Sequence, residues 1–347
     1  MKSDSIVKKI ILIIFKICLG IALFVCLNLL FMPKYIEENN DGRITAEFYR
    51  EKTPIDVIFT GSSLIHAGIS PMALYRDYGI TAYDRSNSSQ TIALSYYIAE
   101  ETIKRNKPEL IVADVGFIYE ASDYVDEGAS RKALDGMKWS SSKVKAINSM
   151  MDETEYFTDY MFPILRFHSR WNDLKPEDLK YLFYKPTVTA NGQLIQFNIF
   201  DGGVSYNPYH LEEDRTACDE NMQYLQKLSD LCKDNNVQLA LIKLPSYECN
   251  WNRALDDQIS DFAGRNDLYY KSFIDDFDSI GLEIPDFSDR QHMNSNGAEK
   301  FSKVLGEYLV NNYTVSDRRN DGKINAVFEE KLDRYNSLMA DKTNVYK

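Results

Sequence analysis

One segment constrains the fold of this chain more than any other. It is the apolar run over residues 10–32, in which Lys16 and Asn28 are the only strongly polar residues. As a helix, these 23 residues extend about 34 Å, enough to cross the roughly 30 Å hydrocarbon core of a bilayer. Residues 1–9 contain three lysines and one aspartate, which favours a cytoplasmic N-terminus and export of the chain beyond residue 32. We therefore predict a single-pass cell-membrane protein with a signal anchor over residues 10–32 and an extracytoplasmic domain.

A cleaved signal peptide is the alternative interpretation of this run. The apolar part of a signal peptide is normally shorter, and no small-x-small cleavage site precedes Met32. Val25 is also too bulky, directly before Cys26, for a lipoprotein signal. The length of the run therefore favours an uncleaved anchor.

Composition limits the remainder of the chain to an acidic, globular domain. The 347 residues carry 40 Lys+Arg against 52 Asp+Glu, a net charge of −12, which argues against nucleic acid as a partner. Only 5 cysteines occur, so a disulfide-dense scaffold is excluded. Cys218, Cys232 and Cys249 lie beyond the apolar run, an odd number that leaves at least one unpaired. Cys232 shares a helical stripe with two leucines and is expected in the core.

Strand-like and helix-like segments alternate after a polar stretch over residues 33–53, which we interpret as a stalk. Continuous apolar strands separated by helices favour an α/β domain whose parallel sheet is covered on both faces. We place this domain at residues 54–312, with a less regular insertion around 119–219 and a C-terminal extension over 313–347. The expected strands are 56–60, 81–83, 110–115 and 238–244, and the expected helices are 70–78, 91–105, 221–233 and 298–308.

Polar residues follow the strands at the positions where such sheets bind ligands, beyond the carboxyl ends. Gly61-Ser62-Ser63 follows the first strand, and a polar loop over residues 84–90 follows the second. The segment 289–294 lies directly before the last predicted helix and contains an aspartate and a histidine. A hydroxyl, an imidazole and a carboxylate are thus all present in loops of the expected kind.

These groups match what nucleophilic catalysis by serine requires. An imidazole must take the proton of the hydroxyl, and a carboxylate must orient the imidazole. Asp289 and His292 are three residues apart, so a loop can bring the carboxylate to one ring nitrogen and leave the other for Ser63. Backbone N–H groups at the glycine-flanked turn are candidates for an oxyanion hole. Donors from Asn87, Ser88 and Ser89 are expected to add to it.

The chain has only 4 histidines, and the other three lack a comparable partner. His66 lies three residues after Ser63, and we interpret it as structural or as lining the cleft. His210 lies in a polar loop with no partner pattern and is expected to be solvated.

Two of these segments carry a resemblance to a known family. Residues 57–64, Val-Ile-Phe-Thr-Gly-Ser-Ser-Leu, resemble the first block of the SGNH/GDSL hydrolase superfamily, with Ser62 in place of the usual aspartate. Asp289-Arg-Gln-His292 resembles the closing Asp-x-x-His block of that family. The resemblance implies a flavodoxin-like three-layer domain with Ser63 as the nucleophile, His292 as the base and Asp289 as its orienter.

The chain departs from the family pattern in two places. The second block normally offers a glycine as oxyanion donor, whereas this loop reads Ser86-Asn-Ser-Ser-Gln90. The third block normally reads Gly-x-Asn-Asp, whereas residues 115–119 contain no asparagine. The identity of the oxyanion donors therefore stays open.

Membrane-anchored members of the family resemble the chain more than the secreted lipases do. The Gly-Ser-Ser start and the Asp-x-x-His-Met-Asn ending are similar to the D-alanyl transfer protein of the teichoic-acid pathway and to O-acyltransferase-like SGNH proteins. This resemblance implies an esterase or O-acyltransferase acting on a cell-envelope glycan or teichoic-acid-like polymer. It also suggests a multispanning protein that delivers the acyl donor.

Other interpretations of the same residues remain open. A Ser-Ser pair after a strand often caps a helix, and Ser62 is the second candidate for the nucleophile. A domain with this fold but without an effective oxyanion hole would serve as a non-catalytic envelope-binding or assembly protein.

A second cluster combines Arg166, His168 and Arg170, which would share one face of an extended segment. An arginine fork suits a phosphate or carboxylate of the substrate. An ion-pair patch against the acidic excess of the chain is the interpretation we favour.

The sequence offers no support for a cofactor or a metal. It contains no Walker-type glycine-lysine motif, no Cys-x-x-Cys and no His-Glu-x-x-His. The segment around Asp321-Gly322 is similar to a calcium loop, but Phe328 occupies the twelfth position, where a carboxylate is required. We interpret it as a turn.

Overall fold

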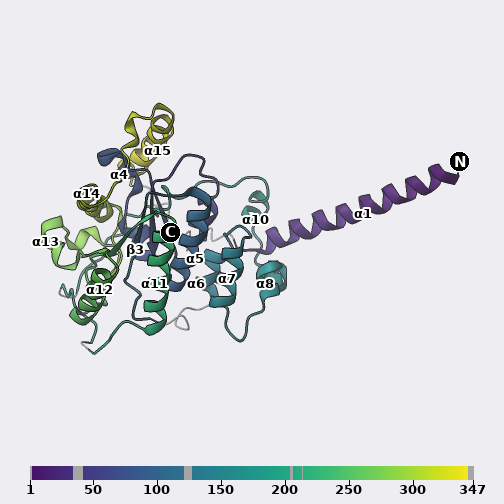
Figure 1. Ribbon diagram of the computed structural model, residues 1–347. Helices are drawn as coiled ribbons and strands as arrows, with labels where there is room; N and C mark the ends of the chain where they lie inside the picture. The colour runs from purple at the N-terminus through teal and green to yellow at the C-terminus, as the bar shows by residue number, and fades with distance from the viewer. Residues whose placement is uncertain (1, 34–41, 121–126, 204–205, 213, 343–347) are drawn as a thin grey trace. The chain divides into compact units, whose positions relative to one another are not determined.

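The computed structural model describes all residues except 1, 34–41, 121–126, 204–205, 213 and 343–347 (Figure 1). The chain divides into two compact units. The first joins residues 1–34 to residues 153–187, and the second joins residues 35–152 to residues 188–347.

The first unit is built around the long N-terminal helix α1 (Lys2–Phe31). Its apolar stretch Ile6–Phe31 is the only described helix long and apolar enough to cross a membrane, and none of it is buried inside the protein. This confirms a helix at the predicted position. The short helices of residues 153–187 pack against it: α8 (Phe157–Met161), α9 (Pro163–Phe167), η2 (His168–Asn172) and α10 (Pro176–Lys180).

The second unit contains a five-stranded, all-parallel sheet with the strand order β2-β1-β3-β4-β5. This is the flavodoxin-like doubly wound order, so the predicted fold class is confirmed. The strands are β1 (Val57–Gly61), β2 (Ala82–Ser86), β3 (Leu110–Asp114), β4 (Gln238–Lys243) and β5 (Tyr269–Ser272).

Alternate side chains of the strands enter two separate hydrophobic cores, as the period of two in a strand requires. Ile58, Ile111 and Leu239 belong to the core that also contains apolar residues of three helices, α5 (Ile92–Asn106), α11 (Asp219–Asp234) and α12 (Arg253–Arg265). Phe59 and Val112 belong to the core that contains residues of α3 (Ser63–Gly68), α4 (Pro71–Tyr78) and α14 (Ser295–Asn312). Helices therefore cover both faces, and the unit has three layers.

Helices of the second unit begin and end close to the predicted positions, and several carry side-chain caps. Thr91 caps α5 through Leu94 N–H, and Asn294 caps α14 through Asn296 N–H. Cys232 is buried in the core, as predicted. The helices are α2 (Gly42–Phe48), α3 (Ser63–Gly68), α4 (Pro71–Tyr78), α5 (Ile92–Asn106), α6 (Glu127–Leu134), α7 (Ser141–Met150), α11 (Asp219–Asp234), α12 (Arg253–Arg265), η3 (Ile274–Asp276), α13 (Phe277–Ile280), η4 (Ile284–Asp286), α14 (Ser295–Asn312), η5 (Arg318–Asn320) and α15 (Gly322–Ala340).

Part of the predicted stalk belongs to the folded unit. Residues 42–48 form α2, and Ile44 and Phe48 are buried in the core. Tyr83 Oη donates a hydrogen bond to Ile44 O at 2.9 Å, and the Glu47 carboxylate accepts from the N–H groups of Val188 and Thr189. These contacts contradict a free stalk over these residues, whereas residues 34–41 of that prediction lie outside the described part.

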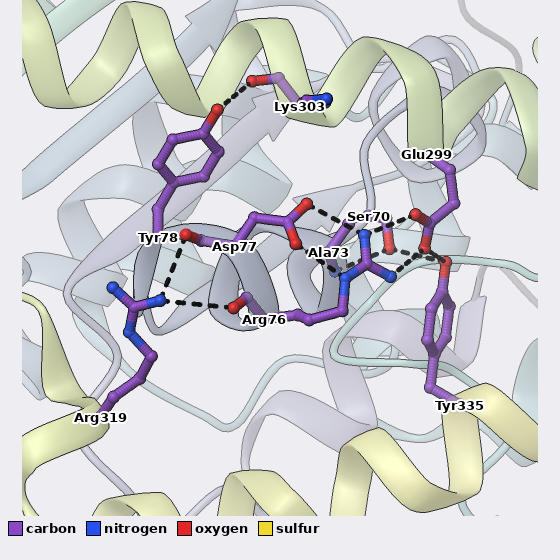
Figure 2. Close-up of polar contacts among 9 residues, drawn as sticks. All are labelled: Ser70, Ala73, Arg76, Asp77, Tyr78, Glu299, Lys303, Arg319 and Tyr335. Carbon is purple, nitrogen blue, oxygen red and sulfur yellow. Dashed lines mark hydrogen bonds and ion pairs between the residues drawn. The ribbon is translucent and has the colours of Figure 1, made fainter.

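The predicted C-terminal extension is also part of the fold. Helix α15 stacks Phe328 on Tyr75 of α4 with ring centroids 4.4 Å apart. Figure 2 shows Tyr335 of α15 donating a hydrogen bond to Glu299 of α14 at 2.7 Å, while Arg76 of α4 binds the same carboxylate. The three helices are therefore joined by packing and by polar contacts.

We expect Phe328→Ala to destabilise the second unit by about 3–5 kcal/mol, because it empties a fully buried site in the core. The neighbouring Val327 is exposed, so Val327→Ala is the matched control and should change stability by less than about 1 kcal/mol. Chemical denaturation of the full chain in detergent measures both. If the two variants had equal effects on stability, this would contradict the conclusion that α15 is packed into the second unit.

Candidate active site

The site is built on the turn after β1. Gly61 ends the strand with φ 151°, a conformation that favours glycine. A Cβ atom here would lie 2.8 Å from Asp114 Cβ, so the close approach of β3 also requires glycine. Ser62 then caps α3, its Oγ accepting from Leu64 N at 3.4 Å, and Ser63 is the first residue of the helix.

Three side chains form a hydrogen-bonded relay beyond the sheet. Ser63 Oγ lies 2.7 Å from His292 Nε2. His292 Nδ1 lies 2.8 Å from Asp289 Oδ2 and 3.0 Å from Oδ1. These distances are those expected of a nucleophile, a base and an orienting carboxylate. The structure brings Ser63 to the imidazole, whereas Ser62 is buried and serves as the cap.

The loop that carries the relay is held by its own hydrogen bonds. Asp289 Oδ1 accepts from the N–H groups of Gln291 and His292, both at 2.8 Å. Partial burial raises the pKa of the Asp289 carboxyl, but the hydrogen bonds from the His292 imidazole and from the two N–H groups outweigh it, and the pKa is lower than usual. An ionised Asp289 favours the tautomer with the proton on Nδ1, which leaves the Nε2 lone pair toward Ser63.

The same loop is fixed to the start of α14. Asn294 N–H donates to Asp286 O at 2.8 Å, and Lys300 Nζ of α14 binds the Asp286 carboxylate at 2.7 Å. A Cβ at Gly297 would lie 2.4 Å from Asp286 O, so only glycine lets the helix approach this closely. The position of His292 therefore depends on the packing of α14.

The three predicted oxyanion donors differ in their surroundings. Asn87 is fully buried, and its Nδ2 donates to Gln90 Oε1 at 3.0 Å. Gln90 Nε2 donates in turn to Thr60 Oγ1 at 2.9 Å, so both amides hold the loop against β1. Ser88 and Ser89 are partly exposed, and Ser89 has φ 53°. Of the three, only these two serines have side chains in contact with solvent.

Neither His66 nor His210 takes part in the relay. His66 is buried, and its Nδ1 lies 3.0 Å from Ser86 Oγ at the end of β2, in agreement with a structural role. His210 is half exposed, but its Nε2 lies 3.4 Å from the Glu248 carboxylate. His210 is thus in contact with solvent, as expected, and it also has a carboxylate neighbour that the sequence did not indicate.

The basic cluster of residues 166–170 belongs to the first unit, whereas Ser63 belongs to the second. Its residues are helical in α9 and η2, so the extended arrangement considered for Arg166, His168 and Arg170 is wrong. Arg170 donates to Phe31 O at 2.5 Å and pairs with Asp178 at 3.3 Å, whereas His168 Nδ1 lies 3.0 Å from Leu165 O. The Asp178 pair agrees with the ion-pair interpretation for Arg170.

Sequence reasoning did not predict that the carboxyl groups of Asp114 and Asp84 are buried. Asp114 ends β3 directly beside Gly61, and burial raises its pKa despite the nearby Lys243 ammonium. Asp84, on β2, is fully buried, and burial raises its pKa well above the usual range. Asp114 ends an apolar strand, where a carboxylate is unusual, and that was the available signal. Asp84 was expected in the loop over residues 84–90, but it lies within β2. The described residues contain no group of three His, Cys, Asp or Glu side chains that could hold a metal ion.

The fold and the relay together define a candidate serine-nucleophile site on a doubly wound sheet. No model of a known protein family matches the chain, and no curated protein matches it either. Among solved structures it is similar to a protein from Bacteroides fragilis, provisionally assigned as an acylhydrolase, at 11% identity and TM-score 0.36, covering 76% of this chain and 93% of that one. It is also similar to a GDSL-like lipase from Bacteroides thetaiotaomicron at 10% identity and TM-score 0.36, covering 78% and 96%. With TM-scores this low, neither likeness carries a conclusion, and the strand order and the site geometry stand on their own.

We expect Asp84→Asn to stabilise the protein more at pH 8 than at pH 5. In the unfolded chain this carboxyl ionises above a pKa of about 3.9, whereas in the folded chain the raised pKa keeps it protonated. The wild-type protein therefore loses stability as the pH rises toward the pKa of Asp84 in the folded chain. The Asp84→Asn variant has a neutral amide in place of this carboxyl and does not lose stability in this way. Melting temperatures of the full chain in detergent measure the difference.

The exposed Asp261→Asn on α12 is the control for the loss of a charge. A gain from Asp84→Asn that is the same at both pH values, or no larger than that of the control, would contradict a buried, protonated Asp84.

Proposed function

We propose that this protein is a membrane-anchored serine hydrolase of the SGNH type that acts on acyl esters. The observation that carries the proposal is the relay in which Ser63 Oγ lies 2.7 Å from His292 Nε2 and His292 Nδ1 lies 2.8 Å from Asp289. The family motifs at residues 57–64 and 289–292 lie on the two segments that supply these side chains, which supports the same assignment.

In the proposed reaction, Ser63 Oγ attacks the ester carbonyl while His292 Nε2 takes the hydroxyl proton. Asp289 stabilises the imidazolium that forms. The tetrahedral intermediate collapses to an acyl-Ser63 ester, and His292 gives the proton to the departing alkoxide. Water or a sugar hydroxyl then attacks the acyl-enzyme, with His292 again as base, and restores free Ser63.

The proposed location of the substrate is deduced from α1. An uncleaved helix of this length keeps the chain in the cell membrane, and the lysines before it favour a cytoplasmic N-terminus. The second unit would then face the envelope, where O-acyl esters of a glycan or teichoic-acid-like polymer are the proposed substrates. Transfer to a polymer hydroxyl, with a multispanning partner delivering the acyl group, is the proposed extension of simple hydrolysis.

A non-catalytic envelope-binding protein is the second candidate. Two observations favour it: residues 115–119 lack the asparagine of the family pattern, and the Asn87 side chain is buried in its own loop rather than free to donate to an oxyanion. A fold with an intact relay and too few oxyanion donors would bind a polymer without cleaving its esters.

Covalent labelling with a fluorophosphonate separates the two candidates. We expect the full chain to be labelled, Ser63→Ala to lose labelling completely, and Ser62→Ala to keep it. Ser62 is the matched control, since its side chain caps α3 and the loss of such a cap costs about 1 kcal/mol. Absence of labelling in wild type, or undiminished labelling of Ser63→Ala, would contradict the hydrolase proposal.

Asp289→Asn should slow labelling by on the order of 100-fold or more, because the amide stabilises neither the required tautomer nor the imidazolium. In wild type the pKa of the Asp289 carboxyl is lowered, so Asp289 stays ionised and should itself contribute no step to the labelling rate between pH 5 and 8. A labelling rate of Asp289→Asn equal to that of wild type would count against this assignment of roles.

A further inference from the structure

Exposed apolar side chains are concentrated in one short segment of the first unit. Outside α1, twelve large hydrophobic side chains of the described residues are exposed, and seven of these lie within residues 153–187, a tenth of the chain. Phe183 is 91% exposed, Trp171 69% and Tyr184 68%. Large exposed apolar groups gathered in this way mark a surface that contacts something other than water.

The segment is attached to the last turns of α1. The rings of Phe162 and Phe24 meet edge to face with centroids 5.5 Å apart. Ile164 N–H donates to Asn28 Oδ1 at 3.1 Å, and Arg170 donates to the C-terminal carbonyl of Phe31 at 2.5 Å. The polar Asn28, unexpected in an apolar run, thus has its partner in this segment.

The attachment lies where a membrane-spanning α1 leaves the hydrocarbon core. The 26 residues Ile6–Phe31 extend about 39 Å as a helix. This length exceeds the roughly 30 Å thickness of the hydrocarbon core by about 9 Å, or about six residues. If α1 enters the core at its N-terminal end, Asn28 and Phe31 lie at the opposite boundary. Residues 153–187, bound to these turns, are then held at the level of the lipid headgroups.

We propose that residues 153–187 form an interfacial segment whose exposed side chains, Trp171, Phe183 and Tyr184 above all, insert into the headgroup layer at the C-terminal end of α1. Tryptophan and tyrosine favour this layer because their rings are apolar and their N–H and O–H groups stay hydrated. The short helices α8, α9 and α10 are each of 5 residues, which suits a segment lying along the membrane surface rather than crossing it.

The occupant of this surface is the bilayer and not a protein partner, because the surface is continuous with the membrane helix itself. The inference rests on the proposed membrane anchoring but not on the proposed chemistry at Ser63. Flotation with lipid vesicles tests the anchoring separately.

Quenching of tryptophan fluorescence by brominated lipids tests the insertion directly. The chain has three tryptophans: Trp171 in the segment, Trp139, half exposed in the second unit, and Trp251, fully buried. The full chain is reconstituted in phosphatidylcholine vesicles whose acyl chains carry bromine either close to the headgroup or close to the chain end. We expect stronger quenching by bromine near the headgroup and loss of most of that quenching in Trp171→Phe.

Trp139→Phe is the matched control and should retain the headgroup-proximal quenching of wild type. Both substitutions keep an aromatic ring at an exposed position, so neither is expected to affect folding. If the chain floats with the vesicles but Trp171→Phe leaves quenching unchanged, the surface does not enter the bilayer, as would be the case if it bound a protein partner. Failure of the chain to float would overturn the anchoring and this inference together.

Discussion

The hydrogen bond between Ser63 and His292 joins two residues that are 229 positions apart, and the parallel sheet holds their loops together. Because parallel strands place their carboxyl ends on one edge, the turn after β1 and the loop before α14 reach the same side of the unit. Gly61 and Asp114 meet there at a distance that no larger residue at position 61 would allow. The position of Ser63, and with it the proposed chemistry, therefore depends on close packing between β1 and β3.

The imidazole side of the site depends on a second support. The Asp289–His292 loop is tied to α14 through Asn294, Asp286 and Lys300. Helix α14 is in turn bound to α4 and to α15 by the contacts of Glu299 (Figure 2). A chain region that lies after the site in sequence thus contributes to the position of His292, through packing rather than through any side chain in the relay.

The parts of the fold that could be predicted from sequence are those with strong local patterns. Strands β1, β3 and β4 are continuous apolar runs. Ser63 lies directly beyond the end of β1, and Asp289 and His292 lie in the loop before α14, which are the positions that the pattern indicated. Strand β5 was missed because Tyr269-Tyr-Lys-Ser272 is short and only partly buried at the sheet edge. Helix α15 has apolar residues at helical spacing, but nothing local indicates that they pack on α4. The attachment of residues 153–187 to α1 and the inward position of Asn87 likewise depend on contacts far apart in the chain.

Formation of an acyl-enzyme on Ser63 is the central claim, and a burst experiment tests it most directly. The full chain in detergent is mixed with p-nitrophenyl acetate, and release of nitrophenolate is followed from the first turnover. The account predicts a burst approaching one equivalent per chain, absent in Ser63→Ala, with the acetyl group found on Ser63 by mass spectrometry. A wild-type trace without a burst, or an acetyl group on another residue, would contradict it.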